Sequence, residues 1–423
     1  MDSIKRIEIY PVLLISFLYF LVTYYISFLL YQNNLFIQVN HFFDADPPTN
    51  LSSLAHGFNE GRNAYSHAFL EILSLPVFAI QSILSTLYND IDTRRIREIL
   101  ALSYSPLFGA LSIIYFYKLL KTIKIQQSLS YLLVLIYMFS FSTLIFSTLV
   151  DTYIISGALI TILLYFYAKS DLNKNIDYKK WLFLGATLAG ITITNISIFF
   201  IVFFSYKIRR GISYYLAFRD TLIMCLLILL VVILYYKITQ IIIGANGFGG
   251  YEGSVGWIRM YFATSPNEIF FKSANMISAF YNSFFGIFIT LNVTDNCLGP
   301  SCHNLSFLRG QNTYPIIVLL LSIFLLYLFK SYQFFSKSGL MWLFSPLALI
   351  IGYNFIFHSF FGKEMFLYSQ HWFVASALLF LIPLMKNRIF LLLILLAEIY
   401  LASCYILYVH EVYELTLPIL TLN

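Results

Sequence analysis

The stretch "YPVLLISFLYFLVTYYISFLLY", Tyr10 to Tyr31, contains no charged residue and is long enough to cross a bilayer as a helix. It follows a short basic N-terminus without a small-residue cleavage site behind it, so we expect a retained helix and not a signal peptide. Similar runs recur along the 423 residues, of which 60% are hydrophobic and 11% charged. The sequence therefore predicts an all-α polytopic membrane protein and excludes a soluble globular domain.

Nine apolar runs are clear candidate spans, and they cover residues 10–31, 98–117, 128–147, 150–168, 219–241, 315–335, 339–358, 366–385 and 387–409. Three further runs are decided by the rule that short cytoplasmic loops are rich in Lys and Arg. The rule places 67–88 and 269–291 on the outer surface as juxtamembrane helices, and it divides 181–206 into two short helices that turn at Thr192–Asn195. We expect about 11 transmembrane helices, with the N-terminus inside and the C-terminus outside.

This arrangement predicts three regions. Residues 1–241 form an N-terminal transmembrane module with a first outer loop at 32–97, residues 242–314 form a second outer segment, and residues 315–423 form C-terminal transmembrane helices. The inner loops are short, so nearly all of the extramembrane chain lies on the outer side. Binding and catalytic residues are most common on loops held by a rigid scaffold, so we expect the chemistry there.

The first outer loop carries the densest set of reactive side chains. The stretch "FFDADPPTN", Phe42 to Asn50, contains Asp44 and Asp46, and further polar residues follow it: His56, Glu60, Arg62 and His67. A carboxylate can deprotonate an acceptor and an arginine can bind a phosphate, which predicts a site for a phosphorylated lipid substrate. In the structural alternative, Asp46 caps a turn with Pro47, and Arg62 pairs with Glu60 or a headgroup.

Two shorter outer turns add candidates. The stretch "HSFFGKEMFLYSQHWF", His358 to Phe373, contributes four polar residues that are candidate lining residues: Lys363, Glu364, Tyr368 and His371. Tyr368 also fits an aromatic anchor at the membrane interface. Asp151 lies in "STLVDTY", Ser147 to Tyr153, where we expect it to cap the next helix.

Cys297 and Cys302 bracket the sequence "CLGPSC" in the second outer segment. Its Gly-Pro step favours the tight turn of a short disulfide loop, and thiols outside the cytoplasm are commonly oxidised. Two free thiols are the alternative. Zinc binding with His303 is a further alternative, but the sequence offers no evident fourth ligand, so no metal site is predicted there.

The organisation of residues 1–210 resembles that of the GT-C superfamily of integral membrane glycosyltransferases, which includes the protein O-mannosyltransferases and the lipid A aminoarabinose transferases. The similarity rests on the acidic "FFDADPP" after the first helix, on "GRNAYSHAFLEILSLPVFAI" leading into a surface helix, on "STLVDTY", and on the paired short helices around "GATLAGITITN". The sequence departs from the family in two places, with "HAF" instead of His-Pro and Val-Asp instead of Pro-Glu.

The resemblance implies an inverting glycosyltransferase that uses a polyprenyl-phosphate-linked sugar. The acceptor is a glycan, a lipid or a protein on the outer face of a bacterial inner membrane. It implies Asp44 as the base, with Asp46 as the alternative, and Arg62 at the donor phosphate with Lys363 and with Arg309 or His371. The Asp-x-Asp spacing also suits a divalent metal, although many members of the superfamily do without one. Membrane lipids are expected partners and nucleic acid is not.

Two other classes share some of these features. A lipid-linked oligosaccharide flippase or another transporter has a similar helix count, but it is expected to show interrupted helices with ionisable groups near the midplane. Glu398 is the one acid in the middle of a predicted span. An envelope polysaccharide polymerase or ligase is closer in chemistry, but it usually carries its large outer loop late in the chain.

Overall fold

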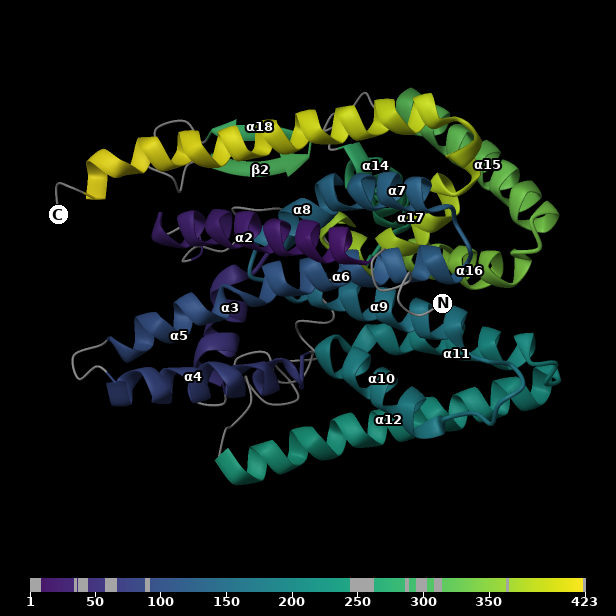
Figure 1. The fold of residues 1–423 in the computed structure, drawn as a ribbon, viewed down its shortest axis with the longest axis horizontal. Coiled ribbons are helices and arrows are strands. Elements are labelled where there is room, and N and C mark those ends of the chain that lie inside the picture. Colours follow the sequence, from purple (N-terminus) through teal and green to yellow (C-terminus); the bar gives the residue numbers. More distant parts are fainter. Residues whose placement is uncertain are drawn as a thin grey trace.

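The computed structural model describes residues 9–33, 36, 45–57, 67–87, 92–243, 262–285, 289–293, 303–307, 314–362 and 365–420. These residues form a bundle in which most of the long helices follow the long axis of the molecule (Figure 1).

Eight helical segments in this part of the chain are long and apolar enough to cross a membrane, and two bent pairs bring the number to ten. The eight are α2 (Tyr10–Gln32), η2 with α4 (Leu70–Leu73 and Ser74–Leu87), α5 with α6 (Thr93–Ala101 and Tyr104–Thr122), α9 (Thr152–Lys169), α12 (Tyr214–Ile243), α15 (Tyr314–Lys337), α16 (Met341–Phe360) and α18 (Arg388–Leu420). The prediction of a helical polytopic membrane protein is confirmed. The number of crossings stays a prediction.

The outward faces of the long helices are apolar. On one face of α12, Leu222, Leu226 and Ile233 expose 45%, 57% and 53% of their surface. Soluble proteins rarely leave an apolar helix face of this length uncovered. These faces are therefore the surface that contacts lipid.

Helix α8 (Phe141–Thr148) lies inside the bundle, and all of its residues are buried. It packs against α2, α6 and α9. Tyr19 of α2 donates a hydrogen bond to the Ser147 hydroxyl at 3.0 Å. Gly109 of α6 allows close packing here, because a Cβ atom at that position would lie 2.2 Å from the same hydroxyl.

Two predicted spans, 128–147 and 366–385, are interrupted. Helix α7 (Gln127–Phe139) meets α8 at Ser140 with a bend of 55°. The Ser140 backbone is extended, and its hydroxyl donates a hydrogen bond to the Tyr137 carbonyl. The backbone N–H groups at the start of α8 therefore do not continue the hydrogen bonding of α7. In the second span, η5 (Met365–His371) bends by 71° into α17 (Phe373–Leu381) and η6 (Pro383–Lys386). Ser140 and Ser142 lie at the first break, and Gln370 and His371 precede the second. Residues of these types also occur in unbroken membrane helices, so composition alone does not reveal either break.

The predicted turn at Thr192–Asn195 is confirmed. It separates α10 (Tyr178–Ile191) from α11 (Ile196–Arg209), and each helix has 14 residues. A helix of that length rises about 21 Å, which is less than the hydrocarbon core of about 30 Å. The short helix η3 (Ile193–Asn195) forms the turn.

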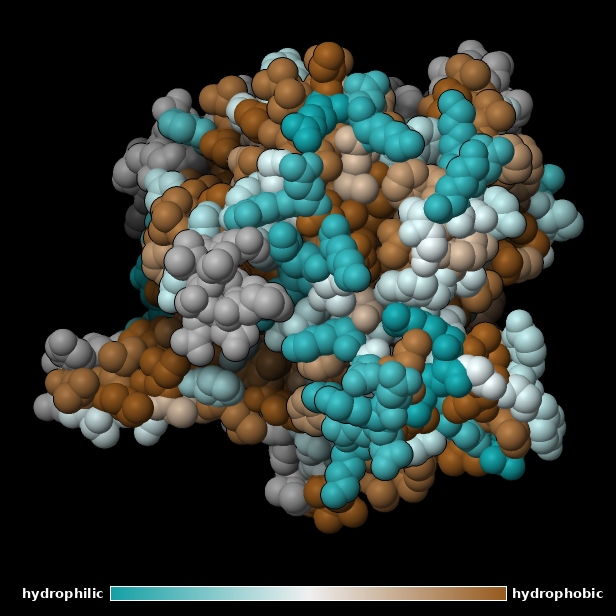
Figure 2. Space-filling model, turned by 45° about the vertical axis from the view of Figure 1, so that its right-hand side comes forward, coloured by the Kyte–Doolittle hydropathy of each residue, from teal (hydrophilic) through white to brown (hydrophobic). Residues whose placement is uncertain are grey.

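Basic residues gather at one end of the bundle. Helices α6, α9, α11 and α15 carry Lys or Arg in their last turn, and α10 begins with Lys179 and Lys180 after Tyr178. These helix ends lie on the right in Figure 1, and Figure 2, which turns that side forward, shows a band of hydrophilic residues between apolar flanks. Lys207, which is 1% exposed, forms an ion pair with Asp220 at 2.8 Å in this region.

The second outer segment contains α14 (Pro266–Phe285), which packs against α16 and η5. It also contains an antiparallel pair of strands, β1 (Ile289–Val293) and β2 (His303–Phe307), in which Val293 lies opposite His303. The structure thus adds a small two-stranded sheet to the predicted helices.

Candidate functional site

Asp46 lies immediately before α3 (Pro47–His56), whose first two positions are prolines. Proline is tolerated there because the N–H it lacks would have no partner within the helix. The Asp46 carboxylate accepts a hydrogen bond from the Thr49 hydroxyl at 2.7 Å and does not cap the helix N–H groups. Its side chain is partly exposed, so a substrate can reach it.

Asp151 lies between α8 and α9 and is 3% exposed. It caps α9, as the sequence predicts, because its Oδ1 atom accepts a hydrogen bond from the Thr152 N–H at 2.6 Å. The backbone N–H of Asp46 donates a second hydrogen bond to this carboxylate, and the two acidic side chains interact electrostatically. The capping residue therefore also holds the segment that carries Asp46.

His67 connects this pair of carboxylates to the turn between α10 and α11. Its Nδ1 atom lies 2.5 Å from the carbonyl oxygen of Ile191. A carbonyl oxygen only accepts hydrogen bonds, so the Nδ1 atom carries the proton and Nε2 is the basic nitrogen of the neutral ring. The Phe69 N–H donates a hydrogen bond to the Gly190 carbonyl at 2.8 Å, which also holds the segment of His67 against the end of α10. His67 also interacts electrostatically with Asp46.

An aromatic and imidazole cluster from α16, α9 and η5 adjoins this arrangement. His358 stacks on Tyr368 with ring centroids 4.0 Å apart. The His371 ring lies 5.9 Å from that of Tyr153 and 6.4 Å from that of His358. His371 interacts electrostatically with His67, so the imidazole cluster and the carboxylate pair belong to one site.

The position of His371 is fixed by its neighbours in η5. The Ser369 hydroxyl lies 2.6 Å from the Ser142 hydroxyl, and the Gln370 side-chain amide donates to Ser142 at 2.7 Å. Gly157 of α9 permits this approach, because a Cβ atom there would lie 2.5 Å from Oε1 of Gln370. The His371 Nε2 atom is buried and has no hydrogen-bond partner among the described residues. Buried polar atoms are usually paired, so this nitrogen is free to bind a substrate group.

The electrostatics of the site centre on Asp151. Burial raises the pKa of its carboxyl group to about 7, and the hydrogen bonds from the backbone of Thr152 and Asp46 only partly oppose that shift. Burial lowers the pKa of the His67 imidazole, so this ring is neutral near pH 7. The site thus combines a carboxyl group that titrates near neutral pH with a neutral imidazole, which is a suitable arrangement for moving protons.

Four of the predicted site residues other than Asp46 meet here: His67, Asp151, Tyr368 and His371. The remaining candidates of the first outer loop and the later turns lie outside the described residues, namely Asp44, Glu60, Arg62, Cys297, Cys302, Arg309, Lys363 and Glu364.

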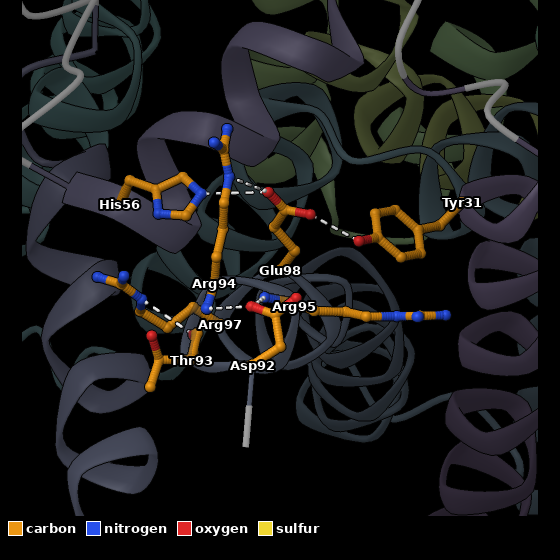
Figure 3. Close-up of polar contacts among 8 residues, drawn as sticks. All are labelled: Tyr31, His56, Asp92, Thr93, Arg94, Arg95, Arg97 and Glu98. Atoms are coloured by element: carbon orange, nitrogen blue, oxygen red, sulfur yellow. Dashed lines mark hydrogen bonds and ion pairs between the residues drawn. The ribbon is translucent and has the colours of Figure 1, made fainter. Parts of the chain in front are cut away.

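His56, a further predicted lining residue, takes part in a separate network (Figure 3). Its Nε2 atom lies 3.2 Å from the Glu98 carboxylate, which also accepts hydrogen bonds from the Tyr31 hydroxyl at 2.6 Å and from Arg94 at 3.2 Å. These contacts join the end of α2 to α3 and α5. We assign His56 to this structural network.

Sequence analysis did not single out Tyr153. It follows Asp151 by two residues and contacts Tyr368 and His371 through its ring. Tyr153 lies in the first turn of α9, directly after Thr152. The expected cap at Asp151 was the signal in the sequence that could have pointed to it.

Within the described ranges, no group of three or more His, Cys, Asp or Glu side chains converges as a metal site requires.

Comparison with known proteins adds no family assignment. No family model, curated protein or solved structure matches this chain.

Proposed function

We propose that this protein is an inverting membrane glycosyltransferase with GT-C-like organisation, which moves a sugar from a polyprenyl-phosphate donor to an acceptor on the outer face. The observation that carries the proposal is the meeting of Asp46, Asp151 and His67 with His371. These residues come from four separate parts of the chain. Convergence of titratable groups, some with a shifted pKa, is typical of catalytic sites.

The reaction that this site supports is a single displacement. The oxygen of an acceptor hydroxyl forms a bond to the anomeric carbon of the sugar, and its proton passes to a carboxylate. The bond between that carbon and the phosphate oxygen breaks, and its electron pair leaves with the lipid phosphate. General-base catalysis of this kind contributes about 10²- to 10⁴-fold in rate, and fixed cationic or hydrogen-bonding groups stabilise the departing phosphate.

The two aspartates of "DAD" compete for the role of base in this proposal. Asp46 is partly exposed and its carboxylate is free of the helix N–H groups, which supports it as the base. Asp44, two residues earlier, is the alternative. Asp151 is buried and holds the backbone of Asp46, which supports a positioning role. For the donor phosphate, Arg62, Lys363 and Arg309 are proposed from the sequence, and His371 from its unpaired Nε2 atom.

An apolar cavity next to the site supports a lipid donor. It lies between α14, α15 and α16, with Met276, Phe280, Phe324, Phe355 and Trp372 in its wall. Trp372 directly follows His371 in the chain. The apolar wall is suited to contact with hydrocarbon.

The proposed location is a bacterial inner membrane with the site on the outer face. Positively charged helix ends normally face the cytoplasm, and they gather at the right of Figure 1, whereas α3, α4 and α5 lie at the opposite end. In this topology the chain has about 11 transmembrane helices, with α10 and α11 counted as two short helices.

Deletion of the gene in its source organism tests this proposal. A strain without the transferase should accumulate the polyprenyl-phosphate sugar on the outer face, where periodate added to intact cells oxidises it. Mass spectrometry of the extracted lipids measures the accumulation. Unchanged polyprenyl-phosphate sugars, together with an unchanged set of envelope glycans, would rule the proposal out.

A second candidate function, transport of a lipid-linked glycan or another solute, is favoured by the broken helices. Helix α7 is interrupted at Ser140, and Glu398 of α18 is fully buried nearby, close to the backbone N–H of Phe141. Neither Glu398 oxygen forms a hydrogen bond of standard geometry within the described part of the chain. Broken helices beside an ionisable group are typical of transporters. For a flippase, the lipid-linked sugar in the deletion strain would accumulate on the inner face and resist periodate.

A further inference from the structure

Three arginines on α5 lie on the unexpected side of the molecule. Arg94, Arg95 and Arg97 belong to the first turns of α5, at the end opposite the basic helix ends of α6, α9 and α11 (Figure 1). Segments on the outer side usually carry few basic residues. A cluster against this trend needs an anionic partner.

The described acids nearby pair with Arg94 but not with Arg95 or Arg97. The Asp92 carboxylate caps α5 by accepting hydrogen bonds from the backbone N–H groups of Arg94 and Arg95, at 3.0 and 3.2 Å. Glu98 accepts from Tyr31 and pairs with His56 and Arg94. Across the described ranges, Arg95 and Arg97 form no ion pair.

The guanidinium groups also do not form a pocket. In Figure 3 the side chains of Arg94, Arg95 and Arg97 point in three different directions. One phosphate ion would need them to converge. A layer of many headgroups, in contrast, can contact each of them separately.

The adjacent helix α4 is suited to the lipid below such a layer. It packs against α5, and its Leu75, Ile80, Ile83 and Leu87 side chains expose between 44% and 68% of their surface. The Arg97 guanidinium lies over the Phe78 ring of α4, 5.0 Å from its centroid, and so joins the cationic helix to the apolar one. A cationic helix face beside an apolar one is typical of elements that lie in the membrane interface.

We propose that α4 and α5 form a binding surface for anionic phospholipid headgroups of the outer leaflet, with α4 in contact with the acyl chains and Arg95 and Arg97 in contact with the phosphates. This inference does not depend on the glycosyltransferase proposal, because it uses neither the carboxylates nor the imidazoles of the candidate site. An arginine near an anionic membrane surface contributes about a fivefold preference for that surface.

Hydrogen exchange in lipid nanodiscs tests the proposal. Wild-type protein is reconstituted in phosphatidylcholine alone and in phosphatidylcholine mixed with phosphatidylglycerol, and deuterium uptake of the α4 and α5 peptides is followed by mass spectrometry. We expect several-fold slower exchange in α5 with phosphatidylglycerol, and high salt should remove the difference. The Arg95→Gln/Arg97→Gln variant should lose the difference, whereas Arg95→Lys/Arg97→Lys should keep it.

The control is Lys179→Gln/Lys180→Gln, which removes two exposed charges at the opposite end. This variant should still show slower exchange of α5 in nanodiscs that contain phosphatidylglycerol. Unchanged exchange of α9 shows that the glutamine variants are folded. Equal exchange of wild-type α5 in the two lipids overturns the proposal and directs the search to an acidic protein partner. If phosphatidylglycerol slows α5 exchange in Arg95→Gln/Arg97→Gln as much as in wild type, the proposal is overturned as well.

Discussion

At the scale of single residues, the pairing of Asp46 with Asp151 explains more of the site than either residue does alone. The sequence identified Asp46 through its Asp-x-Asp motif and Asp151 as a helix cap, and the structure confirms the cap. Their meeting could not be predicted, because it depends on how the start of α3 packs against the start of α9, more than 100 residues later in the chain. Spacing along a sequence carries no information on such contacts.

Asp151→Asn tests the electrostatics of this pair. A carboxyl group whose pKa rises on folding, here to about 7, binds its proton more tightly in the folded protein. Its contribution to stability is therefore complete below about pH 4 and is lost as the pH rises through about 7, with a cost of up to about 4 kcal/mol. In wild-type protein the thermal midpoint should fall between pH 5 and pH 8.

The thermal midpoint of the Asp151→Asn variant should fall less between pH 5 and pH 8, because an amide does not ionise. Scanning fluorimetry of both proteins in one detergent at matched ionic strength measures the two slopes. Parallel curves for wild type and variant would mean that Asp151 does not titrate in this range.

At the scale of elements, the breaks in the helices were the features least visible in the sequence. The predicted span 128–147 becomes α7 and α8, and 366–385 becomes η5, α17 and η6. No proline lies at the Ser140 break, and hydroxyl residues such as Ser140, Ser142 and Thr143 also occur in unbroken membrane helices. The turn at Thr192–Asn195 was predictable, because basic residues at both ends of 181–206 require the chain to return to the same side.

Gly190→Ala tests the contact between the α10–α11 turn and the segment of His67. An added Cβ atom would lie 2.3 Å from two atoms of the Phe69 ring, so the ring and its backbone must move. We expect a destabilisation of about 1–3 kcal/mol, as is usual for overpacking in a tight core, together with weaker transfer activity. Gly352→Ala is the matched control, since nothing lies within 4 Å of its Cβ position. Equal thermal midpoints for the two variants would contradict the packing described.

Glu398→Gln separates the two candidate functions at the α7–α8 break. Glutamine keeps the size of the side chain and cannot ionise. A transferase that uses Asp46 should keep its activity in this variant, because Glu398 belongs to α18 and contacts the break and not the site. Loss of sugar transfer with retained folding, measured by lipid analysis of complemented deletion cells, would instead support a transport cycle that requires this acid.

At the scale of the whole molecule, composition was sufficient to predict a helical membrane protein, since runs of about 20 apolar residues have few other stable solutions. The strands β1 and β2 were not predicted, although Ile289, Leu291 and Val293 alternate with polar residues, because each strand has only five residues and the run 269–291 was assigned to a surface helix.

Cysteine labelling tests the orientation. The background is a variant whose four native cysteines are replaced. Two single-cysteine variants are made from it: Lys174→Cys in the exposed turn between α9 and α10, and Thr93→Cys at the exposed start of α5. A membrane-impermeant maleimide added to intact cells should label Thr93→Cys only, and cell lysis should make Lys174→Cys reactive. The reverse pattern would place the candidate site on the cytoplasmic side.

The central claim is that this site consumes a polyprenyl-phosphate sugar with an aspartate of "DAD" as the base. The most direct measurement is the rate at which labelled polyprenyl-phosphate sugar disappears in deletion cells that carry wild type, Asp44→Asn, Asp46→Asn or the control Gly352→Ala, at equal protein levels. We predict that wild type and Gly352→Ala consume the donor and that one aspartate variant is slower by about 10²- to 10⁴-fold. Donor consumption at the wild-type rate in both aspartate variants would contradict the account.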